Sequence, residues 1–278
     1  MPIRPRTAAL GAGACTALLA VVWFAAFHIG FFGHADESIY IQFGDLHGHG
    51  RVEWVAHHMV SLINVDHYAI WVAALIVITL LRGRPRSAFA AGVIILGANA
   101  STELLKHALA APRDGWLVPP VSWPSGHSTG AMSLALAAVL CAPARLRPAV
   151  AAVGAVLAVA VGYSVVATGM HYPSDVLGGF LMATAWALAI VAALLRAEQW
   201  RPSSTTPAGE RVSVGAALGA PGAVLLAALA LGAIALVTRP HQVASYIRLH
   251  EAFVVGALGI AALGFTLATG MLLSVRRS

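Results

Sequence analysis

The chain has 278 residues, of which 59% are hydrophobic and only 10% are charged. A mean hydropathy of +0.81 excludes an ordinary soluble domain. The net charge of +6 comes mainly from arginines in short polar segments, so it indicates membrane topology and gives no support for nucleic-acid binding. Cys15 and Cys141 fall in different apolar segments at different depths, which argues against a disulfide or a two-cysteine metal site.

Apolar stretches long enough to cross a bilayer as helices, about 17–25 residues, recur along the whole chain. Backbone groups within lipid must be satisfied inside each segment, and strand-like alternation is absent from the sequence. The expected fold class is therefore all-α, a polytopic transmembrane helix bundle. We expect eight spans, at 8–32, 64–81, 88–106, 128–144, 149–169, 176–195, 213–237 and 252–274.

A polar stretch at 196–212, rich in serine and threonine, divides these spans unevenly. We expect the first span and a long outer loop at 1–63, and a core that carries the polar motifs at 64–195. After the linker at 196–212, a transmembrane hairpin follows at 213–278. The first six spans thus form one unit, to which the last two are added.

The outer loop contains one helical pattern. Val52, Val55, Met59 and Leu62 recur at helical spacing, which predicts a short helix. Two placements of this helix remain open: in the lipid interface over the mouth of a site, or packed on the bundle as part of a surface loop.

The distribution of cations between the two sides predicts the orientation. Five lie on one side: Arg51, Lys106, Arg113, Arg239 and Arg248. Twelve lie on the other: Arg4, Arg6, Arg82, Arg84, Arg86, Arg145, Arg147, Arg196, Arg201, Arg211, Arg276 and Arg277. The excess places both termini in the cytoplasm of a multi-pass protein of the inner (plasma) membrane. The predominance of arginine over lysine suggests a GC-rich, bacterial genome.

The most informative polar cluster is His-Tyr-Pro-Ser-Asp at 171–175, at the start of the sixth span. Pro173 suits the first turn of a helix, and the helix dipole favours Asp175 in that turn. From there the carboxylate can reach back to His171. A carboxylate on one ring nitrogen fixes the tautomer and leaves the other nitrogen as a basic lone pair, which predicts a nucleophilic histidine.

A second cluster, Pro-Ser-Gly-His at 124–127, precedes the fourth span. Ser125 is a suitable N-cap, Gly126 permits close backbone approach, and the free N–H groups of a helix start bind anions. His127 lies in the same turn, where it can protonate a leaving oxygen. The orientation given above places both clusters at the extracytoplasmic face.

Two cations precede the second cluster and can neutralise phosphate oxygens. Lys106 is the only lysine of the chain, and Arg113 follows it. Alternative interpretations remain for each: Lys106 can be a lysine that extends from a helix end to the interface, and Arg113 can pair with Asp114. Glu103 lies one helical turn before Lys106 and either pairs with it or orients it.

Together the motifs resemble the type 2 phosphatidic acid phosphatase family, which comprises lipid phosphate phosphatases and is related to vanadium haloperoxidases. Its pattern is Lys-x6-Arg-Pro, then Pro-Ser-Gly-His, then Ser-Arg-x5-His-x3-Asp. The resemblance covers roughly residues 64–195. Two positions depart from it: Asp114 stands where the family has proline, and Val165 where it has an arginine that contacts the phosphate. The matching residues are Lys106, Arg113, Pro124, Ser125, Gly126, His127, Ser164, His171 and Asp175.

The resemblance implies a membrane enzyme that hydrolyses a phosphomonoester or diphosphate of a lipid, either a polyprenyl (di)phosphate or a phosphatidic-acid-like lipid. It implies that His171 attacks phosphorus to give a phosphohistidine, that Asp175 supports it, and that His127 protonates the leaving oxygen. It implies no metal and no other cofactor. The expected partners are the lipid phosphate and membrane lipids, without nucleic acid; the sequence indicates no protein partner. The residues that would bind the phosphate are Lys106, Arg113, Ser125 and Gly126.

Val165 leaves two alternatives open. The chain can be a phosphotransferase that passes the same phosphoryl group to another lipid or a sugar, or a catalytically impaired member that only binds lipid phosphates. Ser164 is a possible additional site residue. Arg239 and Arg248, in the last extracytoplasmic loop, are candidates to replace the missing guanidinium group.

Overall fold

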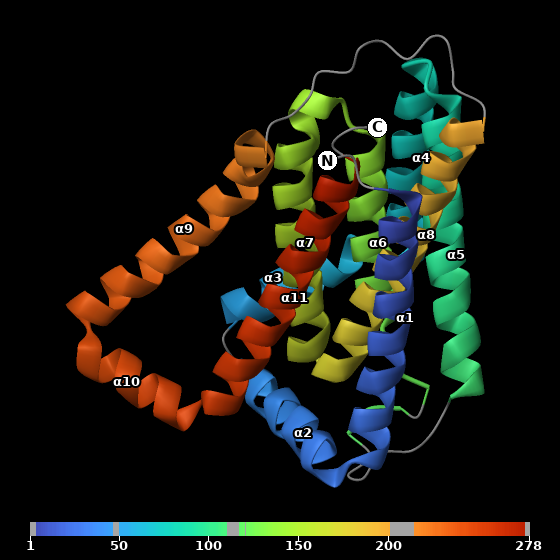
Figure 1. Ribbon diagram of the computed structural model, residues 1–278. Coiled ribbons are helices and arrows are strands. Elements are labelled where there is room, and N and C mark those ends of the chain that lie inside the picture. Colours follow the sequence, from blue (N-terminus) through green and yellow to red (C-terminus); the bar gives the residue numbers. More distant parts are fainter. Residues whose placement is uncertain (1–3, 47–49, 110–116, 120, 201–213, 276–278) are drawn as a thin grey trace.

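The computed structural model describes residues 4–46, 50–109, 117–119, 121–200 and 214–275, and within these ranges all regular structure is helical. The predicted all-α fold class is confirmed. The helices, drawn in Figure 1, are α1 (Pro5–His28), α2 (Gly30–Gly44), α3 (Gly50–Ser61), α4 (Val65–Leu81), α5 (Pro85–Ala108), α6 (Gly126–Cys141), the 3-10 turn η1 (Ala144–Leu146), α7 (Arg147–Ala167), α8 (Pro173–Trp200), α9 (Val214–Thr238), α10 (Pro240–Leu249) and α11 (Glu251–Val275).

Each of the eight predicted spans coincides with a helix, but two of these helices are short. Among the described residues, six helices are long and apolar enough to cross a membrane: α1, α5, α7 with η1, α8, α9 and α11. Helix α4 has 17 residues and forms with α3 a pair bent by 56°. Helix α6 has 16 residues, most of them buried between α5, α7 and α8. The protein is thus a multi-pass membrane protein, with six candidate spans in the part of the chain that the structure describes, or seven if the bent pair counts as one.

The outer loop predicted between the first two spans is largely helical. Helix α3 confirms the helix predicted from its apolar spacing; Ala56 and Val60 are buried, and the helix packs against α7. Helix α2 was not predicted, and it packs against α1, α7 and α11. Helix α10, in the last outer loop, was not predicted either. The outer segment between the first two spans therefore packs directly on the bundle.

The core is centred on α7 and α8, and α11 belongs to it. Ile260, Met271 and Leu272 of α11 are fully buried with residues of α6, α7 and α8. Gly264 permits this approach, since a Cβ there would lie 2.7 Å from Val159 Cγ2. Helix α9 lies at the periphery, against α7 and α11 (Figure 1). The predicted division into a core and a hairpin stays a prediction; residues 196–200 of the predicted linker extend α8, and 201–213 lie outside the described residues.

The start of α1 and the end of α11 lie at the same end of the bundle (Figure 1). There Arg147 Nη1 donates to Val275 O, and Arg84 Nη1 donates to Cys141 O over 2.8 Å. Both arginines belong to the set assigned to the cytoplasm. The two histidine motifs lie at the opposite end, where α7 ends and α8 begins. The arrangement agrees with the predicted orientation, which stays a prediction.

Substitution of Gly97 tests the packing of α5 against α8. A Cβ at Gly97 would lie 2.6 Å from Trp186 Cε3, and the indole is held in place because its Nε1 donates to Ser101 Oγ over 3.0 Å. We expect Gly97→Ala to destabilise the protein by about 1–3 kcal/mol, measured as thermal unfolding in detergent micelles.

Gly92 provides the control on the same helix, since a Cβ there would meet no heavy atom within 4 Å. Gly92→Ala should be neutral or stabilising, by up to about 1 kcal/mol, because alanine favours the helix. Equal melting temperatures for the two variants would contradict this packing.

Candidate active site

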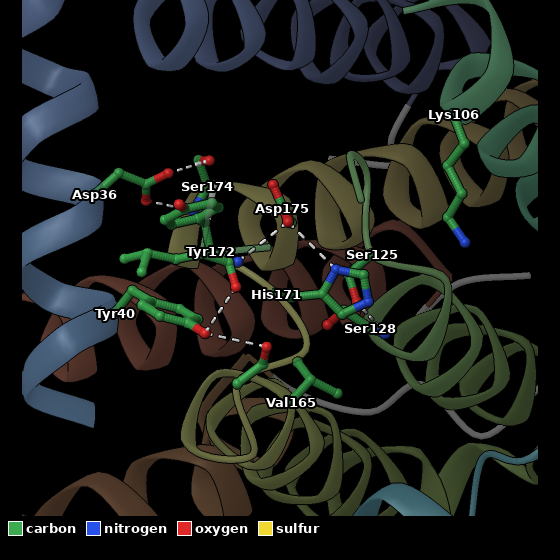
Figure 2. A network of polar contacts seen from close by, with 12 residues as sticks. Asp36, Tyr40, Lys106, Ser125, Ser128, Val165, His171, Tyr172, Ser174 and Asp175 are labelled. Atoms are coloured by element: carbon green, nitrogen blue, oxygen red, sulfur yellow. Dashed lines mark hydrogen bonds and ion pairs between the residues drawn. The ribbon is translucent and has the colours of Figure 1, made fainter. Parts of the chain in front are cut away.

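The centre of the site is the pair formed by His171 and Asp175. Asp175 Oδ2 lies 3.3 Å from His171 Nδ1 and also accepts the Tyr172 N–H over 3.1 Å (Figure 2). Because a carboxylate only accepts, Nδ1 donates the proton and Nε2 keeps its lone pair. Asp175 is fully buried and His171 is 7% exposed, so the pair is shielded from water. The predicted carboxylate-paired histidine is present.

The turn between α7 and α8 holds His171 in place. The N–H groups of Met170 and His171 donate to Val165 O over 3.0 and 3.2 Å. Gly169 has φ +73°, a conformation that favours glycine. Tyr40 of α2 donates its hydroxyl to Gly169 O over 3.2 Å. Burial raises the pKa of the Tyr40 hydroxyl, which therefore remains a neutral donor.

A second residue of α2, Asp36, holds the start of α8. Its Oδ1 accepts the Ser174 N–H over 2.8 Å, and its Oδ2 accepts the Ser174 hydroxyl over 2.5 Å (Figure 2). Asp36 thus caps α8 from a distant part of the chain, and its negative charge suits the helix start. Sequence reasoning missed Asp36 and Tyr40, because neither belongs to a motif and Asp36 is one of several polar residues in this segment.

The start of α6 lies directly against the start of α8. Ser125 is the N-cap of α6, as predicted, and its Oγ accepts the Ser128 N–H over 3.3 Å. The Ser125 N–H donates to Asp175 O over 2.9 Å, so a backbone hydrogen bond joins the two motifs. Gly179 of α8 permits this contact, because a Cβ there would lie 2.7 Å from Ser125 O.

Lys106 extends from α5 to the start of α6 (Figure 2). A Cβ at Gly126 would lie 3.1 Å from Lys106 Nζ and 3.4 Å from Glu103 Oε1, so the ammonium group lies over the glycine backbone. Glu103 Oε1 accepts from Lys106 Nζ over 2.8 Å. Within the described ranges, no hydrogen-bond partner is found for the N–H groups of Gly126 and His127. One cation and two free donors therefore meet at this helix start, as an anion site requires.

His127 lies in the first turn of α6, and its Nε2 is 3.3 Å from Asn64 Oδ1. Asn64 precedes α4, at the bend that follows α3. His171 and Lys106 are close enough to act electrostatically on His127. The structure thus brings both histidines and the lysine to one place, as the motifs predicted.

Three other predicted site residues, Ser164, Arg239 and Arg248, make no described contact with this place. Ser164 Oγ donates to Ala160 O within α7 over 2.7 Å. Arg239 and Arg248 are exposed, at the start and near the end of α10, which packs against α9 and α11. Arg113 lies outside the described residues. Val165 is fully buried beside the His171 turn, so this position presents an apolar side chain.

The arrangement can carry out one kind of chemistry. The unprotonated nitrogen of His171 can act as a nucleophile in a water-shielded place, and Lys106 and the first-turn N–H groups of α6 lie at the neighbouring helix start. His127 can exchange a proton with an oxygen on the opposite side of a bound group. These elements suit the transfer of an anionic group such as phosphoryl to histidine.

Fold and site together define a class: polytopic helical membrane proteins in which a carboxylate-paired histidine lies against a helix start. Residues 87–199 match the family model of the PAP2 superfamily, the family that the motifs resemble. A similar solved structure is that of a transmembrane PAP2-type phosphatidylglycerolphosphate phosphatase from Bacillus subtilis. The match has a TM-score of 0.56 and 19% identity, and it covers 70% of this chain and 98% of that chain. No curated protein sequence matches the chain.

Removal of the Asp36 carboxylate tests its role at the start of α8. We expect Asp36→Ala to cost about 1–2 kcal/mol of stability, because the first turn of α8 loses its cap. Phosphatase activity should fall several-fold, since Asp175 lies in that turn. Both quantities can be measured on the purified protein in micelles.

Ser38→Ala is the control on the same helix. Its hydroxyl donates only to the His34 carbonyl, over 2.8 Å at an exposed position. This variant should keep both stability and activity. If Asp36→Ala behaved like Ser38→Ala, the cap would be unimportant.

Proposed function

We propose that this protein is an integral-membrane phosphatase that removes phosphate from a lipid phosphate through a phosphohistidine intermediate. The observation that carries the proposal is the buried pair of His171 and Asp175 against the start of α6, with Lys106 over Gly126. Nucleophile, anion-binding donors and cation come from three different helices and meet at one point. The match to the PAP2 superfamily supports the same reaction class.

In the first step, Nε2 of His171 attacks phosphorus, an N–P bond forms, and the P–O bond to the lipid breaks. The leaving oxygen takes a proton from His127 and departs as an alcohol, or as a phosphate if the substrate is a diphosphate. Asp175 stabilises the positive charge that develops on the His171 ring. No redox change or metal is needed to balance this step.

In the second step, water attacks the phosphohistidine. His127, now neutral, takes a proton from the water, the N–P bond breaks, and inorganic phosphate leaves. His171 regains its lone pair, held by the same carboxylate. A hydroxyl compound in place of water would make the protein a phosphotransferase, so the two reactions differ only in the acceptor.

Charge on the phosphoryl oxygens would be neutralised by Lys106, by the N–H groups at Gly126 and His127, and by Arg113. Ser125 shapes this helix start through its cap. Val165 contributes no charge. Each missing charge-assisted contact costs about 1.5–3 kcal/mol, so we expect weaker phosphate binding than in a site with the arginine.

The surroundings of the site support a lipid substrate. An apolar groove of about 660 Å³ lies between α1, α5 and α8, lined among others by Leu19, Leu105, Trp123 and Trp186. Leu105 precedes Lys106 and Trp123 precedes the Pro-Ser-Gly-His motif, so the groove ends beside the phosphate site. A hydrocarbon tail can lie there while the phosphate reaches His171. We propose a polyprenyl (di)phosphate or a phosphatidic-acid-like lipid, bound from the extracytoplasmic leaflet.

Phosphate release from a panel of lipid phosphates tests the function. The panel should include a polyprenyl diphosphate, phosphatidic acid and phosphatidylglycerophosphate in mixed micelles. We expect release from at least one, and a fall to below about one-thousandth of the wild-type rate in His171→Ala, because the nucleophile is lost.

His107→Ala is the matched control, since His107 is exposed in the last turn of α5. This variant should keep wild-type activity. A folded wild-type protein that releases phosphate from no lipid, but transfers it to an added alcohol or sugar, would favour the phosphotransferase. Binding without either reaction would favour an impaired member.

The cation that compensates for Val165 can be identified by substitution. We expect Arg113→Ala to raise KM and lower kcat by roughly tenfold or more. Arg239→Ala and Arg248→Ala should each change both constants less than about twofold, since α10 packs away from the motifs. A large loss in either α10 variant would instead show that this helix reaches the phosphate.

A further inference from the structure

His127 is held by a residue that belongs to neither motif. Its Nε2 lies 3.3 Å from Oδ1 of Asn64, which is 63 residues away in sequence. Asn64 occupies the N-cap position of α4, where an asparagine side chain usually accepts a backbone N–H. It forms no such cap bond here. The side chain that would normally cap α4 points instead to the imidazole of His127.

The bend between α3 and α4 is fixed firmly enough to hold this contact. Ile63 packs on α6, where a Cβ at Gly130 would lie 3.0 Å from Ile63 Cγ2. One turn into α4, the Tyr68 hydroxyl lies 3.1 Å from Ser133 Oγ of α6. Asn99 of α5 donates to the same Tyr68 hydroxyl over 3.1 Å. The bend between α3 and α4 therefore has a defined position relative to the first turn of α6.

We propose that Asn64 is a positioning residue that holds His127 as the proton donor for the leaving oxygen. The proposal rests on the phosphatase function given above. The amide oxygen accepts the Nε2–H of His127, which fixes the ring and directs Nδ1 to the exchanged proton.

The two histidines of the site thus have partners of different charge. His171 is paired with the carboxylate of Asp175, which fixes the ring and stabilises positive charge that develops on it during attack. His127 is paired with a neutral amide, which orients the ring without stabilising its charged form. Burial, and after it the nearby His171 and Lys106, lower the pKa of His127 to about 4, which makes its charged form a strong proton donor. A lipid oxygen needs a proton in order to leave, and an imidazolium that gives up its proton readily can supply it.

The dependence on the leaving group tests this role. Dodecyl phosphate releases an alkoxide, which needs a proton to leave, whereas 4-dodecyl-2-nitrophenyl phosphate releases a weakly basic phenolate, which does not. We expect Asn64→Ala to slow first-turnover release of dodecanol by about tenfold or more. Release of the nitrophenol should fall less than about threefold.

Asn64→Asp provides a second, nearly isosteric variant. The added carboxylate favours the charged imidazolium and raises the pKa of His127. Since the proton donor is the charged form, the basic limb of the pH–rate profile for dodecyl phosphate should move to higher pH. Ser61→Ala is the matched control from the same bend, because the Ser61 hydroxyl donates to the His58 carbonyl within α3, over 2.8 Å; it should leave both the ratio of the two substrates and the pH limb unchanged.

Equal losses for the two substrates in Asn64→Ala, or an unchanged basic limb in Asn64→Asp, would overturn the proposal. A melting temperature for each variant shows that the protein tested is folded. The outcome is separate from that of the proposed function, which fails only if wild-type protein hydrolyses neither compound and none of the lipid phosphates.

Discussion

The site depends on one backbone hydrogen bond, from the Ser125 N–H to the Asp175 carbonyl oxygen. Through this bond of 2.9 Å the first turns of α6 and α8 are in direct contact. A buried hydrogen bond contributes only about 0.5–1.5 kcal/mol by itself. Here it also fixes the relative position of two groups. One bonded residue, Asp175, carries the carboxylate that pairs with His171, and the other, Ser125, is the N-cap of α6. Any shift between the helices would therefore move nucleophile and anion site apart.

Side-chain size makes this contact possible. Gly179 leaves room for Ser125 O, and Gly126 leaves room for the ammonium group of Lys106. A methyl group would lie 2.7 Å from Ser125 O at Gly179 and 3.1 Å from Lys106 Nζ at Gly126, so at least the first contact requires glycine. The glycines of this region thus determine which polar groups can approach, and a lipid phosphate would meet an arrangement that is largely preformed.

Val165 changes the balance of charge in this arrangement. The position is fully buried, and its carbonyl oxygen already holds the turn before His171. Valine retains that backbone role, which explains why the histidine is placed correctly without the arginine. Lys106 is paired with Glu103, so part of its charge is already neutralised before a ligand binds. Among the described residues, the groups available to an anion at the start of α6 are therefore Lys106 and the backbone N–H groups of the first turn.

The sequence predicted the features that depend on local spacing. Hydropathy located the spans, apolar periodicity located α3, and the motif 171–175 placed Asp175 next to His171, because residues four apart meet at a helix start. Helices α2 and α10 were missed because each lies in a polar outer segment that hydropathy assigns to a loop. Asp36 and Asn64 were missed for another reason. Their partners lie 138 and 63 residues away, and no local pattern encodes such a contact.

The residues that sequence reasoning missed lie in the same part of the sequence. Asp36, Tyr40 and Asn64 all precede residues 87–199, the segment that matches the PAP2 superfamily. That segment contains both histidines, but each is held from outside it: the His171 turn and the start of α8 by α2, and His127 by the corner before α4. His171 and His127, the proposed nucleophile and proton donor, are therefore contacted by two different parts of one outer segment. Since the segment packs on the bundle through α2 and α3, the geometry of both histidines depends on this packing as well as on the contact between α6 and α8.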